Sequence, residues 1–357
     1  MKTFFLGMED ELFIVKETED GYRSTNHLEG TQPTSLAVDP HNKKRMYCAT
    51  YGQGLWKSED GGEHWRAIGK ANSYYEPMLG NGIRSAHVTS VAVHPTKKSK
   101  GNCIVYAGTE PSALYYSEDN GESWTEYKGI QTLPSKGNWQ FPPRPHTHHV
   151  RWITPSYLHE NHLGVSIEFG AFIRTEDHGE TWEDRPFNSP LDIHTLLAHP
   201  QSPGRLYAAC GDGLIVDGHS YAESIDEGRS WTFMSEGLEN HPYLYHMVLH
   251  PEDPDERFVS AAKHASHAHH SSLYSTIYRK ISDQPWEEVA EGLPCDGSYA
   301  HALAADPTES GVFYAMNNHG LYRFQANEDR WNKVEIDWKK KYINQHPSFL
   351  VVQDQSY

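Results

Sequence analysis

Six short apolar segments of the sequence each end in a proline, and four of them begin with a histidine or tyrosine that could bind a metal ion or transfer a proton. The prolines are Pro40, Pro95, Pro155, Pro200, Pro251 and Pro307. Six residues before them, in the same order, stand Thr34, Thr89, His149, His194, Tyr245 and His301. Because the segments are alike, these side chains should occupy equivalent positions and converge. Imidazoles are common ligands of Mn, Fe, Cu and Zn, so His149, His194 and His301 are expected to hold a divalent transition metal.

A second set of polar residues lies in the turn after the next strand of each repeat. The positions that align there are Glu9, Tyr51, Glu110, Glu168, Asp212, Lys263 or His264, and Asn317 with His319. Carboxylates among them could orient metal ligands, or act as general acid and base without a metal. We expect Glu110, Glu168 and Tyr245 to be the catalytic residues.

Further residues near these positions are expected to contact a substrate. Two long connections, 70–86 and 129–148, should rise over the same mouth of the fold, and long connections in a compact repeat fold are usually functional. The expected substrate-binding residues are Tyr51, Trp139, Arg144, Asp212, His87, His148, His246 and His264.

A repeated turn motif indicates which elements position these residues. Segments 58–65, 117–124, 175–182 and 224–231 all fit the pattern S/T-x-D-x-G-x-x-W. In such a turn the Ser/Thr and Asp side chains accept hydrogen bonds from backbone N–H groups, glycine takes a positive φ, and tryptophan packs beneath the turn. Three short strand-like runs precede each motif and one follows it, so one repeat of about 45–60 residues should form a four-stranded blade.

The repeats predict an all-β chain folded as a single seven-bladed β-propeller domain over residues 1–357. Six blades are counted directly between Thr34 and about Ile336. The seventh would combine residues 1–28 with the strand-like segment 347–354. Strands from both termini would then close the ring and remove exposed edges. Six blades with loose termini are the alternative.

This pattern resembles the Asp-box (BNR) repeat proteins of the sialidase-like propeller superfamily, over nearly the whole chain. The resemblance implies the fold but no single activity, since the superfamily includes sialidases, xyloglucan-active hydrolases, sortilin-type receptors and photosystem assembly factors. It also implies that the box residues Asp60, Asp119, Asp177 and Asp226 are structural. A sialidase would have an Arg-Ile-Pro motif, which is absent, and an arginine triad, whereas Arg84, Arg151 and Arg174 do not stand in matching contexts. Sialidase activity is therefore not expected.

Composition limits the partners and the location. The net charge of −17 argues against binding to nucleic acids or anionic membranes. Four scattered cysteines without a CxxC pair, and an N-terminal segment without signal-peptide features, predict a cytoplasmic protein with free thiols. The sequence contains no phosphate-binding loop and no G-x-S-x-G or HExxH motif, which disfavours nucleotide-driven chemistry and serine acyl transfer.

Together these features predict an intracellular metal-dependent hydrolase or lyase that acts on a small polar substrate at the mouth of the central channel. A non-catalytic binding or assembly propeller is one alternative. The other is a metal-free glycoside hydrolase with paired carboxylates, which requires Glu110 and Glu168 to lie about 5–10 Å apart.

Overall fold

The computed structural model describes residues 1–69, 82–270 and 274–355, and its regular structure is almost entirely β-strand. The strands form seven sheets of four strands each. The predicted seven-bladed, all-β propeller is therefore confirmed, and the six-bladed alternative is wrong. Residues 70–81, which make up most of the predicted loop 70–86, lie outside the described residues.

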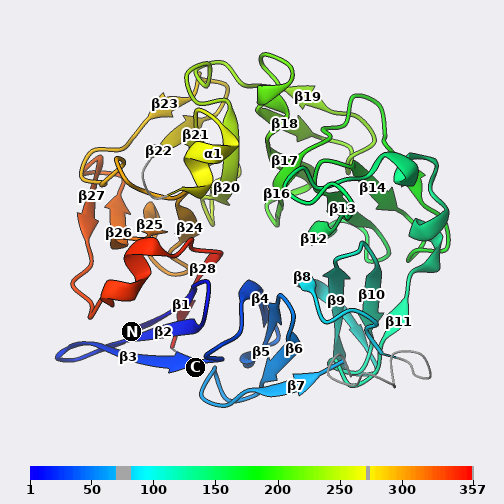
Figure 1. Cartoon of the computed structure of the whole chain (residues 1–357), viewed down its shortest axis with the longest axis horizontal. Coiled ribbons are helices and arrows are strands. Elements are labelled where there is room, and N and C mark those ends of the chain that lie inside the picture. Colours follow the sequence, from blue (N-terminus) through cyan, green and yellow to red (C-terminus); the bar gives the residue numbers. More distant parts are fainter. Residues whose placement is uncertain (70–81, 271–273, 356–357) are drawn as a thin grey trace. The chain divides into compact units, whose positions relative to one another are not determined.

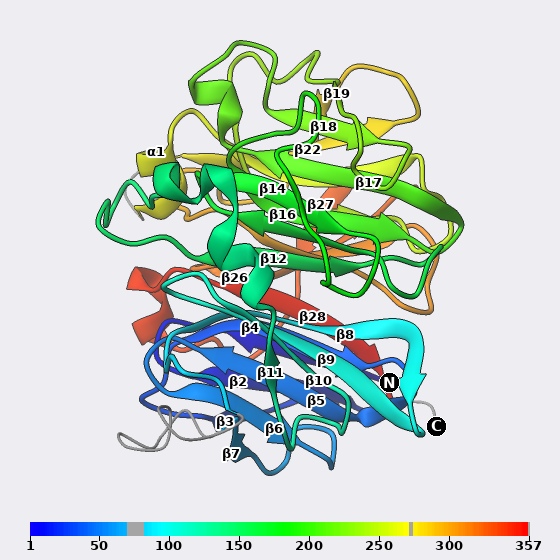
Figure 2. The ribbon, with the colours of Figure 1, turned by 90° about the vertical axis from the view of Figure 1, so that its right-hand side faces the viewer.

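The chain divides into two compact units, and unit 2 consists of Gly30–Leu206 and Glu223–Thr232. It contains three whole blades. In the second of them the long strand β8 (Val88–Ser99) lies along β9 (Asn102–Thr109) in an antiparallel pair (Figure 2). The strands of the three blades are β4 (Pro33–Asp39), β5 (Asn42–Thr50), β6 (Gly54–Ser58) and β7 (Arg66–Ile68); β8 (Val88–Ser99), β9 (Asn102–Thr109), β10 (Leu114–Ser117) and β11 (Thr125–Glu126); and β12 (Val150–Pro155), β13 (Leu163–Ile167), β14 (Ala171–Thr175) and β15 (Glu183–Asp184).

Unit 1 consists of Met1–Glu29, Tyr207–Ala222 and Phe233–Tyr357, and also contains three whole blades. Their strands are β20 (Tyr243–Leu249), β21 (Glu256–Ala262), β22 (Ser275–Ile281) and β23 (Glu287–Glu288); β24 (Ala302–Ala305), β25 (Val312–Asn317), β26 (Gly320–Gln325) and β27 (Arg330–Lys333); and β28 (Phe349–Asp354), β1 (Lys2–Gly7), β2 (Leu12–Thr18) and β3 (Gly21–His27). The remaining sheet has the order β16 (Ile193–His199), β17 (Ser202–Cys210), β18 (Tyr221–Ser224) and β19 (Thr232–Phe233).

One blade of unit 1 joins the two ends of the chain. Strand β28, red in Figure 1, lies beside the dark blue strand β1 in an antiparallel pair that runs from Lys2 opposite Asp354 to Gly7 opposite Phe349. Both strands place apolar side chains in one core with β24 and β25. The predicted closure by strands from both termini is thus confirmed, and β1 does not remain an unpaired edge.

The four complete Asp boxes have nearly identical geometry. In each, the first Ser/Thr hydroxyl accepts a hydrogen bond from the glycine N–H at 2.7–2.9 Å. The Asp Oδ1 accepts a backbone N–H four residues later at 2.9–3.0 Å. The tryptophan Nε1–H donates to the glycine carbonyl at 3.0–3.2 Å. The glycines take φ between +83° and +91°, the left-handed region that the motif requires.

Short helices occupy some of the connections. They are η2 (Lys128–Thr132), η3 (Pro134–Asn138), η4 (Asp212–Leu214), α1 (Ala265–His269) and η5 (Lys340–Asn344). Helices η2 and η3 form part of the long connection 129–148, in which Ile130 of η2 and Trp139, directly after η3, pack into the core of the neighbouring blades. Across the part of the chain that the structure describes, none of the helices has the length and apolarity to cross a membrane. All four cysteines are buried free thiols.

Candidate functional site

A buried carboxylate, Glu110, lies directly after strand β9 and is held by two side chains. Arg144 donates two hydrogen bonds to it, from Nε to Oε1 at 3.1 Å and from Nη2 to Oε2 at 2.7 Å. The Tyr51 hydroxyl donates a third at 3.2 Å. The Arg144 guanidinium also lies over the rings of Tyr51 and Phe141, with 5.1 Å and 4.8 Å to the centroids. Bidentate pairing and stacking together fix the orientation of the carboxylate.

A second carboxylate, Glu168, follows strand β13 and is contacted by two imidazoles and an arginine. Its Oε2 lies 3.0 Å from Nε2 of His149 and 3.2 Å from Nε of Arg151. Its Oε1 lies 3.9 Å from Nε2 of His194. Burial alone would raise the pKa of Glu168, but His149, His194 and Arg151 outweigh it and hold this pKa well below its usual value. Glu168 is therefore an ionised carboxylate at neutral pH.

The imidazole of His149 lies between the two carboxylates. Its Nε2 contacts Glu168, and its Nδ1 lies 3.7 Å from Oε2 of Glu110. One imidazole ring and these two contacts therefore separate the carboxylates. Their oxygens can be no more than about 9 Å apart, which is within the upper limit for the carboxylate pairs of glycosidases.

A third carboxylate, Asp192, stands beside His194 at the start of strand β16. Its Oδ1 lies 3.5 Å from Nε2 of His194 and accepts a hydrogen bond from the backbone N–H of Phe169 at 3.0 Å. Burial opposes protonation of His194, but the carboxylates of Asp192 and Glu168 raise its pKa. The ligand atoms of Glu168, Asp192 and His194 lie within 4.8 Å of one another. We call Glu110, Arg144, His149, Arg151, Glu168, Asp192 and His194 the unit 2 cluster.

Most predicted residues of unit 2 lie in or beside this cluster. Register between repeats brought Tyr51, Glu110, His149, Glu168 and His194 together as expected. His87 stacks on Tyr51 with ring centroids 4.2 Å apart. Two more of the predicted residues, Trp139 and His148, make other contacts. Trp139 is buried in the core with its indole donating to Ser135, and His148 accepts the backbone N–H of Ser112 on Nδ1 and meets the ring of Trp139.

Two members of the unit 2 cluster, Arg151 and Asp192, were not predicted as site residues. Arg151 follows His149 by two residues, and Asp192 precedes His194 by two. Side chains two apart in an extended chain point to the same face. That alternation is the signal that could have found them.

The predicted residues of unit 1 are placed separately. His301 is buried and has both ring nitrogens near polar groups of its own unit, with Nε2 3.1 Å from Nδ2 of Asn317 and Nδ1 3.4 Å from Oγ of Ser275. Burial lowers its pKa to about 3. Asp212 is the buried first residue of η4. Whether His149, His194 and His301 bind a metal stays a prediction.

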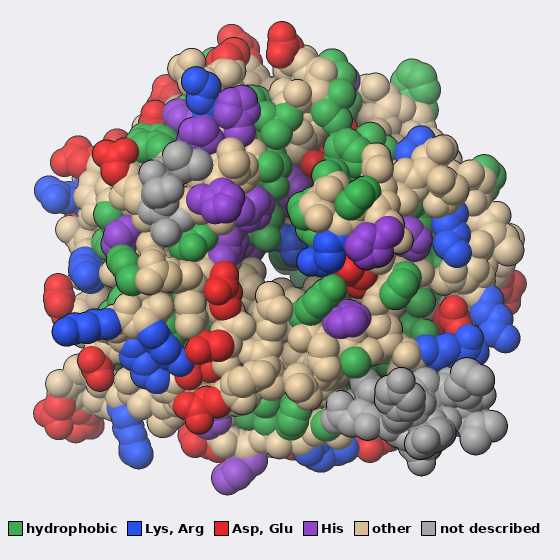
Figure 3. All heavy atoms as spheres, in the orientation of Figure 1, with side chains coloured by type: hydrophobic (Ala, Val, Ile, Leu, Met, Phe, Trp, Pro, Cys, Tyr) green, Lys and Arg blue, Asp and Glu red, His purple; other side chains and the backbone are tan. Residues whose placement is uncertain are grey.

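Histidines and tyrosines gather around helix α1 and strand β20, where the space-filling view shows a concentration of histidine side chains (Figure 3). The Tyr245 ring lies 4.7 Å from that of its neighbour His246 and 4.8 Å from that of His269. His269 hydrogen-bonds Tyr243 at 3.0 Å and His346 at 2.9 Å. His264 is exposed just before α1. These contacts form an aromatic and imidazole patch, and a catalytic role for Tyr245 stays a prediction.

Comparisons with known proteins identify the repeat. A family model described as BNR/Asp-box repeat matches residues 115–126. An oligoxyloglucan-reducing end-specific xyloglucanase of Emericella nidulans is 30% identical over 134 residues, covering 35% of this chain and 15% of the relative. A xyloglucanase of Hypocrea jecorina is 26% identical over 215 residues, covering 55% of this chain and 25% of the relative. The chain thus spans a quarter or less of the length of these relatives.

Solved structures with a similar fold have low sequence identity. The GH74 enzyme of Niastella koreensis matches with a TM-score of 0.64 and 15% identity, covering 92% of this chain and 53% of that one. A structure of YCF48 bound to D1 peptide matches with a TM-score of 0.57 and 16% identity, covering 90% and 92% of the two chains. At such identities the likeness shows the fold alone.

These findings correct the main functional expectation. The two relatives matched in sequence are xyloglucanases, which are glycoside hydrolases, so the expectation of a metal-dependent hydrolase or lyase that acts on a small polar substrate is wrong. The alternative of paired carboxylates agrees better with these relatives and with Glu110 and Glu168. The repeats, the family model and the seven four-stranded blades agree on the architecture, and the chain is a seven-bladed β-propeller that carries Asp-box (BNR) repeats.

Proposed function

We propose that this chain is a glycoside hydrolase that cleaves a xyloglucan-type oligosaccharide or polysaccharide, with Glu110 and Glu168 as its reacting carboxylates. The observation that carries the proposal is the placement of these two carboxylates at opposite nitrogens of His149. Sequence similarity to two xyloglucanases supports the substrate class. A cytoplasmic location remains a prediction.

The environments of the two carboxylates assign different roles. Glu168 is kept ionised by His149, His194 and Arg151, so it accepts a proton from the attacking water. Glu110 rests as a carboxylate paired with Arg144, takes a proton from His149 Nδ1, 3.7 Å away, and passes it to the glycosidic oxygen of the leaving sugar. Glu168 then returns the proton that it took from water to His149 Nε2. Arg144 and Tyr51 hold Glu110 in position. Since the oxygens of the two carboxylates can lie as far as about 9 Å apart, the pair fits the wider spacing of inverting enzymes, and we expect inversion at the anomeric carbon.

The proposal is tested by incubating the full chain with xyloglucan, xyloglucan oligosaccharides and cello-oligosaccharides, and following new reducing ends. Glu110→Gln and Glu168→Gln should each lower kcat by about 100- to 10,000-fold, the usual contribution of a positioned acid or base. Glu180→Gln, an exposed glutamate of the same unit, is the matched control and should leave kcat unchanged. NMR of the first product should show the inverted anomer.

Two results would contradict the proposal. Hydrolysis that survives in both Gln variants would remove Glu110 and Glu168 from the reaction. A folded protein that binds these glycans but releases no reducing ends would favour the binding propeller instead.

A further inference from the structure

The turn between β12 and β13 brings two histidines together at the other end of β13 from Glu168. His159 and His162 are three residues apart, and their ring centroids lie 4.4 Å from each other. Ser156 fixes the turn because its Oγ accepts the backbone N–H groups of Leu158 at 3.0 Å and His159 at 3.1 Å. The His162 N–H also donates to the His159 carbonyl at 3.0 Å. The two imidazoles are thus positioned by local structure.

A buried glutamate from the fourth Asp box completes the group. Oε2 of Glu227 lies 2.8 Å from Nδ1 of His159 and 2.7 Å from Nδ1 of His162. Its other oxygen accepts a hydrogen bond from the Ser156 hydroxyl. All three residues belong to unit 2. Three potential ligand atoms therefore lie within 4.8 Å of one another.

Glu227 stands where the Asp box ordinarily requires a left-handed backbone. The residue between the Asp and the Gly of the box is Gly61, Asn120, His178 or Glu227, with φ between +58° and +79°. Glycine and asparagine tolerate this backbone conformation, whereas it is unfavourable for glutamate unless other contacts compensate. The contacts of the Glu227 carboxylate supply the compensation.

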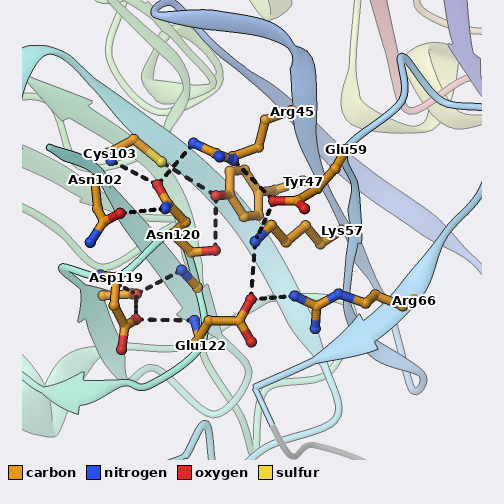
Figure 4. A network of polar contacts seen from close by, with 12 residues as sticks. Arg45, Tyr47, Lys57, Glu59, Arg66, Asn102, Cys103, Asp119, Asn120 and Glu122 are labelled. Carbon is orange, nitrogen blue, oxygen red and sulfur yellow. Dashed lines mark hydrogen bonds and ion pairs between the residues drawn. The ribbon is translucent and has the colours of Figure 1, made fainter.

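The same position already links neighbouring blades in the second box. Asn120 Oδ1 accepts hydrogen bonds from Arg45 of β5 at 2.9 Å and from the backbone N–H of Cys103 at 2.8 Å (Figure 4). Glu227 makes the equivalent link to the preceding blade, but its partners there are the two imidazoles, where Asn120 has Arg45. A glutamate and two histidines therefore stand where the second box has an asparagine and an arginine. These three side chains supply atoms that can bind a metal ion.

From this geometry we infer that His159, His162 and Glu227 bind a divalent transition-metal ion, with Zn²⁺ as the best fit. Two imidazole nitrogens and one carboxylate oxygen are a ligand set that Zn²⁺ takes, with a solvent molecule in the fourth position. Both histidines can offer Nδ1 as a ligand atom when their ring proton is on Nε2. The ion would tie the β12–β13 turn to the Asp-box hairpin.

The surroundings admit a cation. The side chain of His159 is 53% exposed, which leaves a path from solvent. Two arginines line the same hollow, and both are paired with carboxylates, Arg174 with Glu183 at 2.6 Å and Arg205 with Glu223 at 2.6 Å. The net charge of −17 favours the approach of cations. Strand β13, five residues long, separates this site from Glu168 by roughly 17 Å, so its role is structural.

The test compares Zn²⁺ binding by the full chain and by Glu227→Asn. Asparagine is the residue of the second box at this position and suits the backbone, so the variant should fold, while one ligand is lost. Chain stripped with EDTA is titrated with ZnCl₂ by calorimetry, and bound zinc is counted by mass spectrometry after gel filtration. Wild type should bind one more zinc ion per chain than Glu227→Asn and than His159→Ala/His162→Ala. Affinity at this site should fall by more than about 100-fold, since even partners outside the ligand shell are worth about 10- to 100-fold.

A second readout is thermal stability. ZnCl₂ should raise the Tm of wild type and of His64→Ala, and should not raise that of Glu227→Asn. His64 is the matched control because it is an exposed histidine paired with a single carboxylate, Asp60, at 2.7 Å in the first Asp box. Equal zinc stoichiometry and an equal rise in Tm in wild type and Glu227→Asn would overturn the inference. Neither readout uses glycan hydrolysis, so failure here and failure of the proposed function are separable.

Discussion

At the scale of single residues, the unit 2 cluster shows how buried carboxylates are kept charged. Glu110 is 4% exposed and Glu168 is nearly buried, and each is contacted by at least one arginine. A carboxylate taken out of water costs several kcal/mol unless charged donors compensate for the lost hydration. The side chains that surround Glu110 and Glu168 are therefore required for the fold as well as for any chemistry.

This requirement gives a prediction for Arg144. Arg144→Met removes two charge-assisted hydrogen bonds from Glu110, and because that carboxylate stays buried, the free energy of unfolding should fall by about 1–2 kcal/mol. Glu110→Gln in the same chain should restore part of the loss, because the uncompensated charge is gone. Urea unfolding of the two single variants and the double variant measures this coupling.

The matched control for Arg144 is Arg66, which pairs with Glu122 where both side chains are 52% exposed. Arg66→Met should lower the free energy of unfolding by less than about 1 kcal/mol, because exposed ion pairs usually contribute no more than that. If Arg144→Met lowered the free energy of unfolding no more than Arg66→Met does, the Arg144–Glu110 pair would contribute no more than an exposed ion pair, which would contradict the prediction.

Some of this cluster could be predicted from the sequence and some could not. Alignment of the repeats placed Glu110, Glu168, His149 and His194 at one site, because equivalent positions in successive blades face the same way. Arg144 was expected at the site, but its bidentate grip on Glu110 depends on the path of a long connection that no repeat specifies. The kind of site could not be decided from the residue types, because histidines and glutamates that suit a metal ion also suit one another as ion pairs. Sequence types alone do not distinguish the two.

At the scale of elements, a recurring turn closes the first strand of several blades. The residue before the proline in this turn is Asp39, His94, His199, His250 or Asp306, and its side chain accepts backbone N–H groups two or three residues later. Aspartate does this with a carboxylate oxygen and histidine with Nδ1. The shared acceptor role explains why both Asp and His occur at this position.

A pH dependence follows for His94. Its Nδ1 accepts the N–H of Lys97 at 2.9 Å and its Nε2 lies 3.2 Å from the Glu160 carbonyl, so the ring must be neutral. Burial lowers the pKa of His94 from 6.5 to about 4. Between these values the unfolded chain binds a proton that the folded chain does not, so stability should fall as pH decreases through this window, by at most about 1.4 kcal/mol per pH unit.

The variant that checks this is His94→Asn, whose side-chain oxygen can still accept but does not titrate. Urea unfolding between pH 4.5 and 6.5 should show a shallower loss of stability in His94→Asn than in wild type. Identical slopes in the two proteins would mean that His94 is not the group that responds to acid.

At the scale of the whole molecule, the architecture follows from repetition. One turn motif with one strand pattern, repeated along 357 residues, specifies the same four-stranded unit each time, and this is why the number of blades can be counted from the sequence. The hardest blade to predict is β28–β1–β2–β3, because its strands come from the two ends of the chain and its turn motif is weak. Pairing of β28 with β1 depends on contacts between residues more than 340 positions apart, such as Gly7 and Phe349.

Gly7 is the position at which one added carbon atom should weaken the pairing of β28 with β1 most. A Cβ added to Gly7 would lie 2.5 Å from Cε1 of Phe349, a residue that is only 8% exposed and cannot turn away freely. Gly7→Ala should therefore push β28 from β1 and cost about 1–3 kcal/mol, as extra atoms in a packed core usually do. Gly137→Ala is the control, since a Cβ there meets no atom within 4 Å, and its change in stability should stay within about 0.5 kcal/mol. Urea unfolding and size-exclusion chromatography give the comparison, because a loosened β28 also exposes the edge of β1 and should promote association. If Gly7→Ala matched Gly137→Ala in stability and remained monodisperse, the strand from the C-terminus would not be what holds this blade together.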